Sequence, residues 1–453
     1  MSRRIALTNL NATTMDILNV IRTNASLEYQ QNVPVVESIS DIPRVGEVLY
    51  GYPSLANQFI NALVNRIAMV RVKSATFNNA YAELKKGYLE FGETVEEVFV
   101  GIAKAREFSA EKAEKREFKR TLPDVKTAFH VMNWRVQYPI TIQDEDLRMA
   151  FSSANGVQDL IAKIVDSVYT AAEYDEYLLF KYLMIKAITS GKMYPVNIGD
   201  GGMTKAGVAF RGMSNKITFI KTDYNASGVH TSTPKNNQYI FMDSMYNAEY
   251  DVNVLAGAFN MEKAEFMGKL KLIDDWTTFD NERFKVILEN SDMIEEVTDD
   301  ELALMVGVKA VLVDDEWFQI YDNMNKMTET HVASGLYWNY FYNVWKTVSS
   351  SPFSNAIVFV TDEADTALPK SFSVKVANVS ESEHAKTYTL ELVDRVGVSG
   401  GNVEFLQTEE ATEDGVAIHK YGGVMCSADT ALNLTLKANV NGTEYTANTP
   451  ITM

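Results

Sequence analysis

The residues best suited to chemistry are five histidines, one cysteine and three acidic clusters, and their spacing points to no active site. The histidines stand far apart, without the H-E-x-x-H spacing of a zinc site: His130, His230, His331, His384 and His419. No G-x-S-x-G nucleophile motif occurs. Cys426 is the only cysteine, which excludes an intrachain disulfide and a cysteine-based zinc site. We therefore expect no enzyme activity, no cofactor and no metal.

The acidic clusters lie at residues 274–275, 299–301 and 314–316, where predicted strands end or helices begin. Carboxylates at such positions cap helix N-termini and solvate turns, so we expect structural roles for them. The glycine-rich run at residues 194–214 lacks the G-x-G-x-x-G and G-K-[ST] spacing of a phosphate cradle. We expect a flexible loop there.

Composition limits the class of protein. The chain has 453 residues, is 46% apolar and carries a formal net charge of −18, which predicts a folded protein of two or three domains. A nucleic-acid surface would need clustered Lys and Arg instead. Residues 1–18 lack the apolar core of a signal peptide, and Lys181 and Lys186 interrupt the longest apolar run, so we expect no membrane span. A soluble protein of a reducing cytosol is the expectation.

The element that must position everything else is a long helix over Val157–Ser190. Apolar residues recur there at spacings of three and four: Leu160, Ile161, Ile164, Val165, Val168, Ala172, Leu179, Tyr182 and Leu183. The opposite side carries Lys163, Asp166, Thr170, Glu173 and Lys181. Asn155 is the expected N-cap and Gly191 the expected end. Asp175 and Glu176 interrupt the apolar stripe, so the surface packed against them must be partly polar.

Residues 84–131 are dense in charges of both signs, with thin apolar alternation, and cannot bury much by themselves. Two structures fit this pattern: a solvated helix with i,i+4 ion pairs, or a two-stranded arm held by a neighbour. We favour the arm, because Gly87 and Gly92 bracket short β-like pieces and Pro123 interrupts the remainder.

The flanking regions are simpler. A short helix over Thr14–Arg22, capped by Thr13 or Thr14, should lead into extended chain through Pro34, Pro43 and Pro53, either as an arm or as a loosely ordered terminus. Residues 55–67 should be helical. Between residues 216 and 313 we expect an α/β domain, with strands at 216–222, 238–243, 269–274, 284–290 and 307–314 and helices at 247–268 and 298–306.

The aromatic-rich run at residues 317–362 should form a long sheet, a sugar- or base-stacking patch being the alternative. A linker at 362–369 should then lead to a small all-β module of immunoglobulin-like type.

Several motifs in a fixed order resemble one known family. They are NQFINALVNRIAMV (57–70), KKG (85–87), GETVEEV (92–98), the stretch 110–115, LPDVKTAFH (122–130), TIQDEDLRMAF (141–151), AAEYDEY (171–177), YDVNVLAGAFNM (250–261) and GLYWNYFYNVW (335–345). The chain resembles the major capsid proteins of small phi29-type podoviruses. These proteins have the tailed-phage capsid fold, of the Hong Kong 97 (HK97) type.

The resemblance implies an α+β, HK97-type fold with a C-terminal immunoglobulin-like β domain. Its parts would be an N-terminal arm (1–54), a peripheral domain (55–214 and 314–362), an axial domain (215–313) and the C-terminal domain (366–453). The peripheral domain would contain an extended E-loop (71–135) and the spine helix (152–191). The wider fold includes lysine–asparagine crosslinks; Lys85 and Lys86 lie in the right region, but no partner is evident.

The implied function is that of a major capsid protein, forming pentamers and hexamers of an icosahedral or prolate phage head in the host bacterial cytoplasm. Partners would be other copies, a scaffolding protein, a portal protein and head fibres. The head would enclose double-stranded DNA without sequence-specific binding. The expected inter-subunit contacts are charged E-loop residues: Glu93, Glu96, Glu97, Lys104, Arg106, Glu111, Lys112, Lys115, Arg116 and Arg120. The alternatives are an encapsulin-like compartment and a carbohydrate- or host-binding protein that acts through the C-terminal module.

Overall fold

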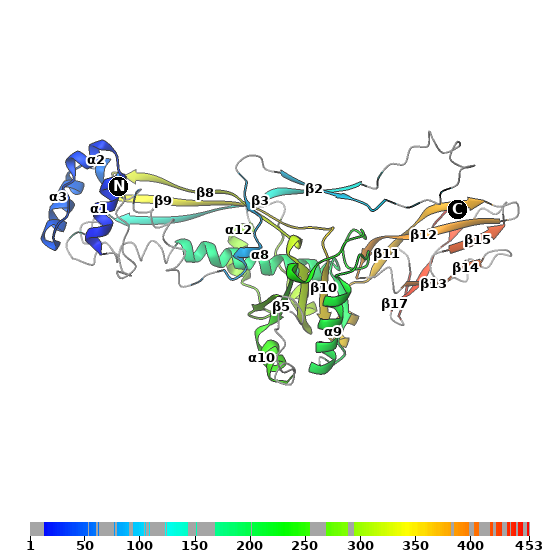
Figure 1. Cartoon of the computed structure of the whole chain (residues 1–453). Helices are drawn as coiled ribbons and strands as arrows, with labels where there is room; N and C mark the ends of the chain where they lie inside the picture. The colour runs from blue at the N-terminus through cyan, green and yellow to red at the C-terminus, as the bar shows by residue number, and fades with distance from the viewer. Residues whose placement is uncertain are drawn as a thin grey trace.

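The computed structural model describes residues 13–452 except 53, 60–61, 63–76, 78, 90–93, 104, 106–107, 109–122, 124, 144–150, 152–167, 201, 254–268, 289–293, 382–384, 398–402, 407–416, 420–422, 428–432, 435, 441–442 and 447–450. The molecule is elongated (Figure 1). A long sheet runs along much of it, with the N-terminal helices at one end and a C-terminal module at the other. A second sheet with its own helices lies to one side between these ends.

The long sheet contains five strands in the order β1-β8-β9-β3-β2. Their bounds are Gly87–Tyr88 (β1), Thr94–Val100 (β2), Val125–Gln143 (β3), Phe318–Val332 (β8) and Tyr337–Ser350 (β9). β1 lies parallel to β8, and the other neighbours are antiparallel. The aromatic-rich run was expected to build such strands, and over β8 and β9 this prediction is confirmed.

The second sheet has the order β4-β10-β7-β5-β6. Its strands are Tyr194–Asn197 (β4), Gln238–Asp243 (β5), Lys269–Ile273 (β6), Val308–Asp314 (β7) and Ala356–Val360 (β10). Helices α9 (Met203–Lys216) and α10 (Ser244–Asn253) pack on one face, and α8 (Thr170–Thr189) packs on the other. β10 was expected in the long sheet, which is wrong, because it pairs with β4 and β7 instead.

The described part of the spine helix is α8, and the rest of the predicted span, up to residue 167, lies outside the described residues. Gly191 ends the helix as predicted: its φ is 66°, and the Lys192 amide donates to the Ala187 carbonyl at 2.8 Å. α8 lies between the two sheets and is buried on nearly all sides. Lys181 was therefore wrongly expected in solvent, since it is only 1% exposed.

The N-terminal region is more helical than predicted. Helix α1 (Thr14–Asn24) has the expected Thr13 cap, with the Asp16 amide donating to Thr13 Oγ1 at 3.3 Å. It is followed by α2 (Leu27–Asn32), η1 (Ile39–Asp41) and α3 (Ile42–Gly51). The predicted extended chain is wrong over α3, because Pro43 occupies its first turn, where a missing N–H costs nothing. These helices pack on Trp338 and Tyr340 at the end of the long sheet.

Three further predictions in the middle of the chain are wrong. Residues 203–216 form α9 and not a flexible loop, because Ala206, Phe210 and Met213 make a buried helical stripe. Residues 281–288 form α12 (Asn281–Leu288), which replaces most of the strand expected at 284–290. Short apolar runs of this kind fit a helix or a strand equally well. The strand expected at 216–222 is also absent, and only an isolated bridge between Lys221 and Thr231 occurs there.

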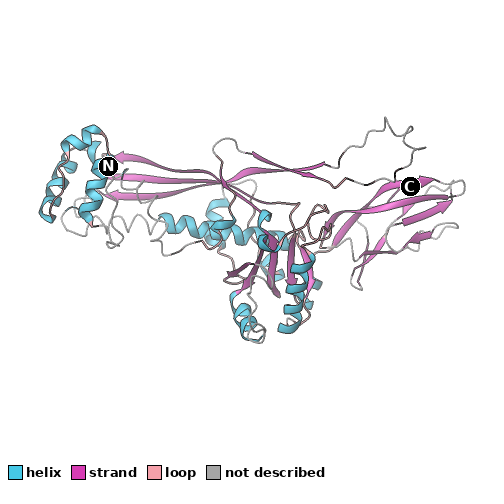
Figure 2. Ribbon diagram, viewed as in Figure 1, coloured by secondary structure: helices cyan, strands magenta, loops and turns pink. Residues whose placement is uncertain are grey.

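The expected linker is a short helix, α14 (Asp362–Ala367), and every element described after it is a strand (Figure 2). The strands are Ser371–Glu381 (β11), Ala385–Val396 (β12), Val403–Leu406 (β13), Ala417–His419 (β14), Gly423–Ser427 (β15), Asn433–Leu434 (β16), Lys437–Val440 (β17), Thr443–Thr446 (β18) and Ile451–Thr452 (β19). The all-β prediction is confirmed, although β15 was not foreseen. In the described residues, no helix is long and apolar enough to cross a membrane.

Candidate assembly interface

Strands β2 and β3 form a two-stranded arm, defined here as residues 94–100 and 125–131. Their antiparallel register places Thr94 opposite Val131 and Val100 opposite Val125. In the view of Figure 1 the arm extends past the rest of the long sheet, in the direction of the C-terminal module. Of the two structures considered for this segment, these residues form the two-stranded one, and the predicted support of the arm by a neighbour stays a prediction. Residues 109–122 lie outside the described part.

The inner face of the arm packs on the arm's own subunit. The rings of Phe99 and Phe353 lie 5.7 Å apart, and Lys126 Nζ donates to the Ser227 carbonyl at 2.9 Å. Ser227 and Phe353 belong to loops beside the second sheet. Because alternate residues of a strand point to opposite faces, these contacts determine which side chains point outward.

His130 ties the arm to β9. Its ring is 3% exposed, with Nε2 lying 3.1 Å from Glu97 Oε2 and Nδ1 lying 2.5 Å from Ser349 Oγ. Ser351 Oγ also donates to Glu97 Oε1, at 2.7 Å. Serine, histidine and a carboxylate also make up hydrolase triads, but Ser349 lies within the β8–β9 ladder, opposite Gln319. This cluster fixes the position of the arm, and nothing in it indicates catalysis.

The outer face of the arm is mainly apolar. Five side chains on it, each 36% to 63% exposed, form what we call the outer strip: Val98, Val100, Val125, Phe129 and Val131. Opposite partners in the register share a face, so Val100 lies beside Val125, and Phe129 lies beside Glu96. Large exposed apolar patches are typical of surfaces that bind a partner.

A buried ion network, here called the base network, lies where the arm segment joins the body. It contains two lysines and two carboxylates: Lys85, Lys346, Glu176 and Asp322. Lys346 Nζ lies 2.5 Å from both Glu176 Oε2 and Asp322 Oδ1. Lys85 Nζ lies 3.0 Å from Glu176 and 2.8 Å from Asp322. The network therefore joins the spine helix, two strands of the long sheet and the segment that leads into the arm.

The charges in the base network balance. Burial alone would raise the pKa of Glu176, but Lys346 and Lys85 outweigh burial and lower it. The same two lysines lower the pKa of Asp322 against the effect of burial. Asp175 makes a separate contact, with Arg283 and with the Tyr138 hydroxyl. The expected polar packing around Asp175 and Glu176 is thus confirmed.

Only two of the ten predicted contact residues lie in the described part, and the structure separates them. Glu96 points outward, whereas Glu97 points inward and bonds to His130 and Ser351. Glu97 is thus engaged within its own subunit, and a contact with a neighbour stays a prediction for it as for Glu96. The others lie outside the described residues and stay predictions: Glu93, Lys104, Arg106, Glu111, Lys112, Lys115, Arg116 and Arg120.

Sequence reasoning missed the outer strip. Its signal was present, because Val98 and Val100, like Phe129 and Val131, stand two residues apart, but the many charges nearby directed attention to ion pairs. The acidic clusters have the structural roles expected of them, in helix caps and turns. Glu301 closes a capping box with Thr298, Asp314 accepts a bond from the Glu316 amide, and Asp275 accepts one from Thr277.

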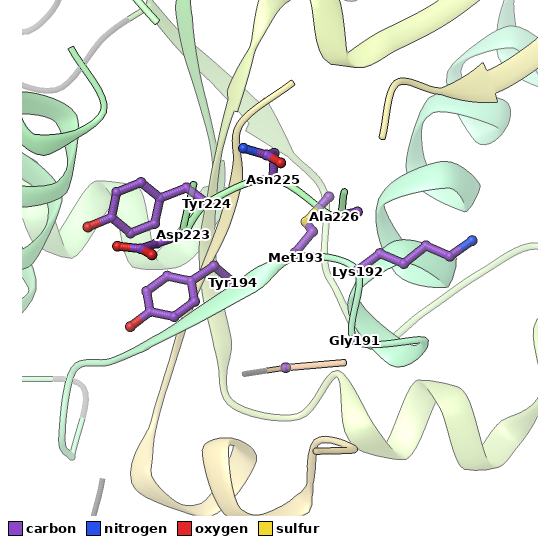
Figure 3. A pocket seen from close by; sticks show the side chains of 9 residues that line it. Gly191, Lys192, Met193, Tyr194, Asp223, Tyr224, Asn225 and Ala226 are labelled. Carbon is purple, nitrogen blue, oxygen red and sulfur yellow. The ribbon is translucent and has the colours of Figure 1, made fainter. Parts of the chain in front are cut away.

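One cavity lies where the C-terminal module meets the body. Gly397, Gly191 and residues 192–194 and 223–226 line a volume of about 20 Å³, with Lys192 pointing away from the rings of Tyr194 and Tyr224 (Figure 3). A volume of this size holds a single water molecule and no substrate. In the described residues no group of three or more His, Cys, Asp or Glu is placed to hold a metal.

The sequence matches one family model and several relatives. The family model described as Phi29-like phage major capsid protein matches residues 18–360. The major capsid protein of Bacillus phage B103 is 33% identical over 436 residues, which cover 94% of this chain and 90% of the relative. The corresponding protein of Bacillus phage PZA is 31% identical, covering 95% and 90%. A solved capsid structure of Staphylococcus phage Andhra aligns with a TM-score of 0.49 and 13% identity, over 63% of this chain and 84% of that one.

Proposed function

Because the chain belongs to the Phi29-like phage major capsid protein family, we propose that the arm joins neighbouring copies in the phage shell through its outer strip. The function of the chain is that of a phage major capsid protein, a structural component of the virion. The encapsulin-like alternative is not favoured, since the curated relatives named above are phage capsid proteins.

The observation that carries the proposal is the two-sided arm. Phe99, Lys126 and His130 hold the inner face of the arm to its own subunit. These contacts fix the position of the outer strip relative to the rest of the subunit. Preorganised apolar surface needs no ordering on binding, which reduces the cost of association. Repeated modest contacts of this kind are sufficient for a closed shell, because each copy is held by several neighbours.

The family also suggests a role for each part of the chain in the assembled shell. The arm corresponds to an E-loop, the long sheet and α8 to a peripheral domain, and the second sheet to an axial domain of the HK97-type fold. Pentamers and hexamers would close an icosahedral or prolate head around double-stranded DNA in the host cytoplasm, with scaffolding protein, portal protein and head fibres as partners. The C-terminal strands, arranged in several antiparallel sheets, are consistent with an immunoglobulin-like sandwich.

The test uses full-length protein co-expressed with its candidate scaffolding protein and viewed by negative-stain electron microscopy. Val98→Ser with Phe129→Ser makes the outer strip polar without touching the inner face. We expect a folded subunit, judged by circular dichroism, that forms few or no shells. Val379→Ser, which changes an exposed valine of the C-terminal module, is the matched control and should assemble normally. Normal shell yield from the double variant would refute the role of the outer strip.

A further inference from the structure

Helix α9 leaves one side uncovered. It packs on the second sheet through Phe210 and Met213, and it projects from that sheet on the side away from α8 (Figure 1). Val208, on its outward side, is 71% exposed, and Phe219 and Ile220, just after the helix, are 68% and 55% exposed. Among the described residues, nothing covers these apolar side chains.

Gly212, on the same outward side, is not required by packing within the subunit. Lys205, Val208, Gly212 and Lys216 recur at spacings of three and four, so they share one side of α9. A Cβ built on Gly212 would have no atom within 4 Å, and its φ is not positive. A hollow of about 520 Å³, lined by Lys205 and Val208 among others, adjoins this side.

This glycine lowers the stability of the subunit without a benefit inside it. Glycine in a helix interior, compared with alanine, shifts the unfolding constant about fivefold toward the unfolded chain. Glycine is useful where another backbone approaches closely, because it has no Cβ. The position of Gly212 therefore indicates a partner that approaches the outward side of α9.

The surroundings of this side are basic, although the whole chain has a net charge of −18. Between residues 203 and 235 the chain has one acidic residue, Asp223, and five basic residues: Lys205, Arg211, Lys216, Lys221 and Lys235. In the part of the chain that the structure describes, the side chains of Lys205, Lys216 and Lys221 form no ion pair. We call this surface the α9 face and define it by its exposed apolar residues, Gly212 and the three lysines.

The opposite face of the second sheet is acidic. Phe284 and Val297 pack there in the same core as α8, so the chain around them lies on that face. It carries five exposed carboxylates, which form what we call the acidic face: Glu282, Glu295, Glu296, Asp299 and Asp300. Within the described ranges, none of the five pairs with a cation. Arg283 is bound to Asp175, and Lys285 is an exposed cation on the same segment.

We propose that the α9 face of one copy packs on the acidic face of the next, as a contact between neighbouring subunits separate from that of the arm. This inference rests on the proposed function, because it needs copies that assemble. The two surfaces differ and lie on opposite sides of one subunit, so the contact is head-to-tail. Repeated head-to-tail contacts close a ring when the rotation between copies permits it. The opposite charges favour this orientation, since the reverse one would bring like charges together.

Double-stranded DNA would also attract the lysines of the α9 face. It does not account for the exposed Val208, Phe219 and Ile220, nor for the unpaired carboxylates on the other face of the sheet. An apolar centre with a charged rim is typical of a surface that binds protein. A second copy of the chain explains both faces at once.

The test is a charge exchange in the full-length chain, co-expressed with its candidate scaffolding protein and without a packaged genome. Lys205→Glu with Lys216→Glu should leave a folded subunit, judged by circular dichroism, and lower the yield of shells about tenfold or more. Adding Glu295→Lys with Glu296→Lys to the same chain should restore most of the yield, because each contact again joins opposite charges. Sedimentation and electron microscopy measure the yield.

The matched control is Lys192→Glu with Lys326→Glu. These two lysines are exposed and lie outside the α9 face, and the change in net charge is the same. This variant should assemble normally, which separates the proposed contact from a general effect of charge.

Gly212→Leu tests the close approach independently of charge. In the unassembled chain, leucine should lower the unfolding constant about fourfold, because it favours a helix and extends into open space. The same variant should form fewer shells, because its side chain occupies the room that the partner needs. Gly51→Leu, at the end of α3 and also with no atom within 4 Å of a Cβ, is the control and should assemble normally.

Normal shell yield from Lys205→Glu with Lys216→Glu would overturn this inference and leave the proposed function intact. A loss that the second pair of substitutions does not restore would mean that the lysines bind another partner, such as the scaffolding protein, and would also overturn it. Wild-type chain that forms neither shells nor rings would count against the proposed function as well.

If the fourfold variant does not fold, carbodiimide treatment of wild-type shells gives the answer. This reagent joins a lysine amine and a carboxylate that are in contact. The two faces lie on opposite sides of one subunit, so a link between them joins two copies. Mass spectrometry should find peptides from residues 205–221 linked to peptides from residues 282–300, and their absence would overturn the inference.

Discussion

Replacing Lys346 with Met should destabilise the subunit by about 3 kcal/mol. The change breaks the base network and leaves two buried carboxylates with only one lysine to compensate their negative charge. Lys346 is 5% exposed and contacts both Glu176 and Asp322 at 2.5 Å. Met has a similar length and no charge, so packing is largely kept and the electrostatic loss dominates. Breaking a buried pair typically costs roughly 3–5 kcal/mol. We expect the lower end of this energy range, because Lys85 still contacts both carboxylates.

The assay is urea unfolding at pH 7.5, followed by near-ultraviolet circular dichroism, with the m-value compared between variants. Glu83→Gln is the matched control: it breaks the Lys271–Glu83 pair, whose carboxylate side chain is 54% exposed, and should cost less than about 1 kcal/mol. A Lys346→Met variant that loses no more stability than this control would refute the reasoning.

The same network predicts a pH dependence. The folded-state pKa values of Glu176 and Asp322 are lowered, so their stabilisation is present above their unfolded values, near pH 4, and is lost as the pH falls through the folded values. When the pH is lowered, the unfolding free energy of Lys346→Met should therefore fall by less than that of the wild type.

Four further outcomes are expected. Leu336→Asn should raise the unfolding free energy by about 1 kcal/mol, because the exposed leucine has a φ of 53°, which asparagine tolerates better; thermal unfolding tests it. Gly191→Ala should lower the unfolding free energy by more than about 1 kcal/mol, since the φ of Gly191 is 66° and a Cβ there would lie 2.2 Å from Val396 Cγ1. A protease should then release the C-terminal module faster from the variant than from the wild type. Removing residues 371–453, which keeps the buried Leu368, should leave shells visible by electron microscopy. Charge reversal to Glu at four arm positions should give a folded subunit that does not assemble, as sedimentation would reveal: Arg106, Lys112, Lys115 and Arg116.

The features that the sequence predicted correctly depend on short-range rules. Thr13 with Asp16, and Thr298 with Glu301, have capping-box spacing and begin helices where expected. Gly191 ends the spine helix because only glycine adopts a positive φ without strain. The polar surroundings of Glu176 followed from a charge placed in an apolar stripe, which must find a partner if it is buried.

Features that depend on distant partners could not be predicted. Lys346 and Glu176 are 170 residues apart in the chain, so no local pattern indicates that they pair. The alternation in β2 separates two faces but does not say which is covered; Phe353 and Ser227 decide that Val98 points outward and Glu97 inward. Local spacing thus determined where the capped helices begin, where the spine helix ends and that β2 alternates, whereas long-range packing decided which charges are buried and which face of the arm is exposed.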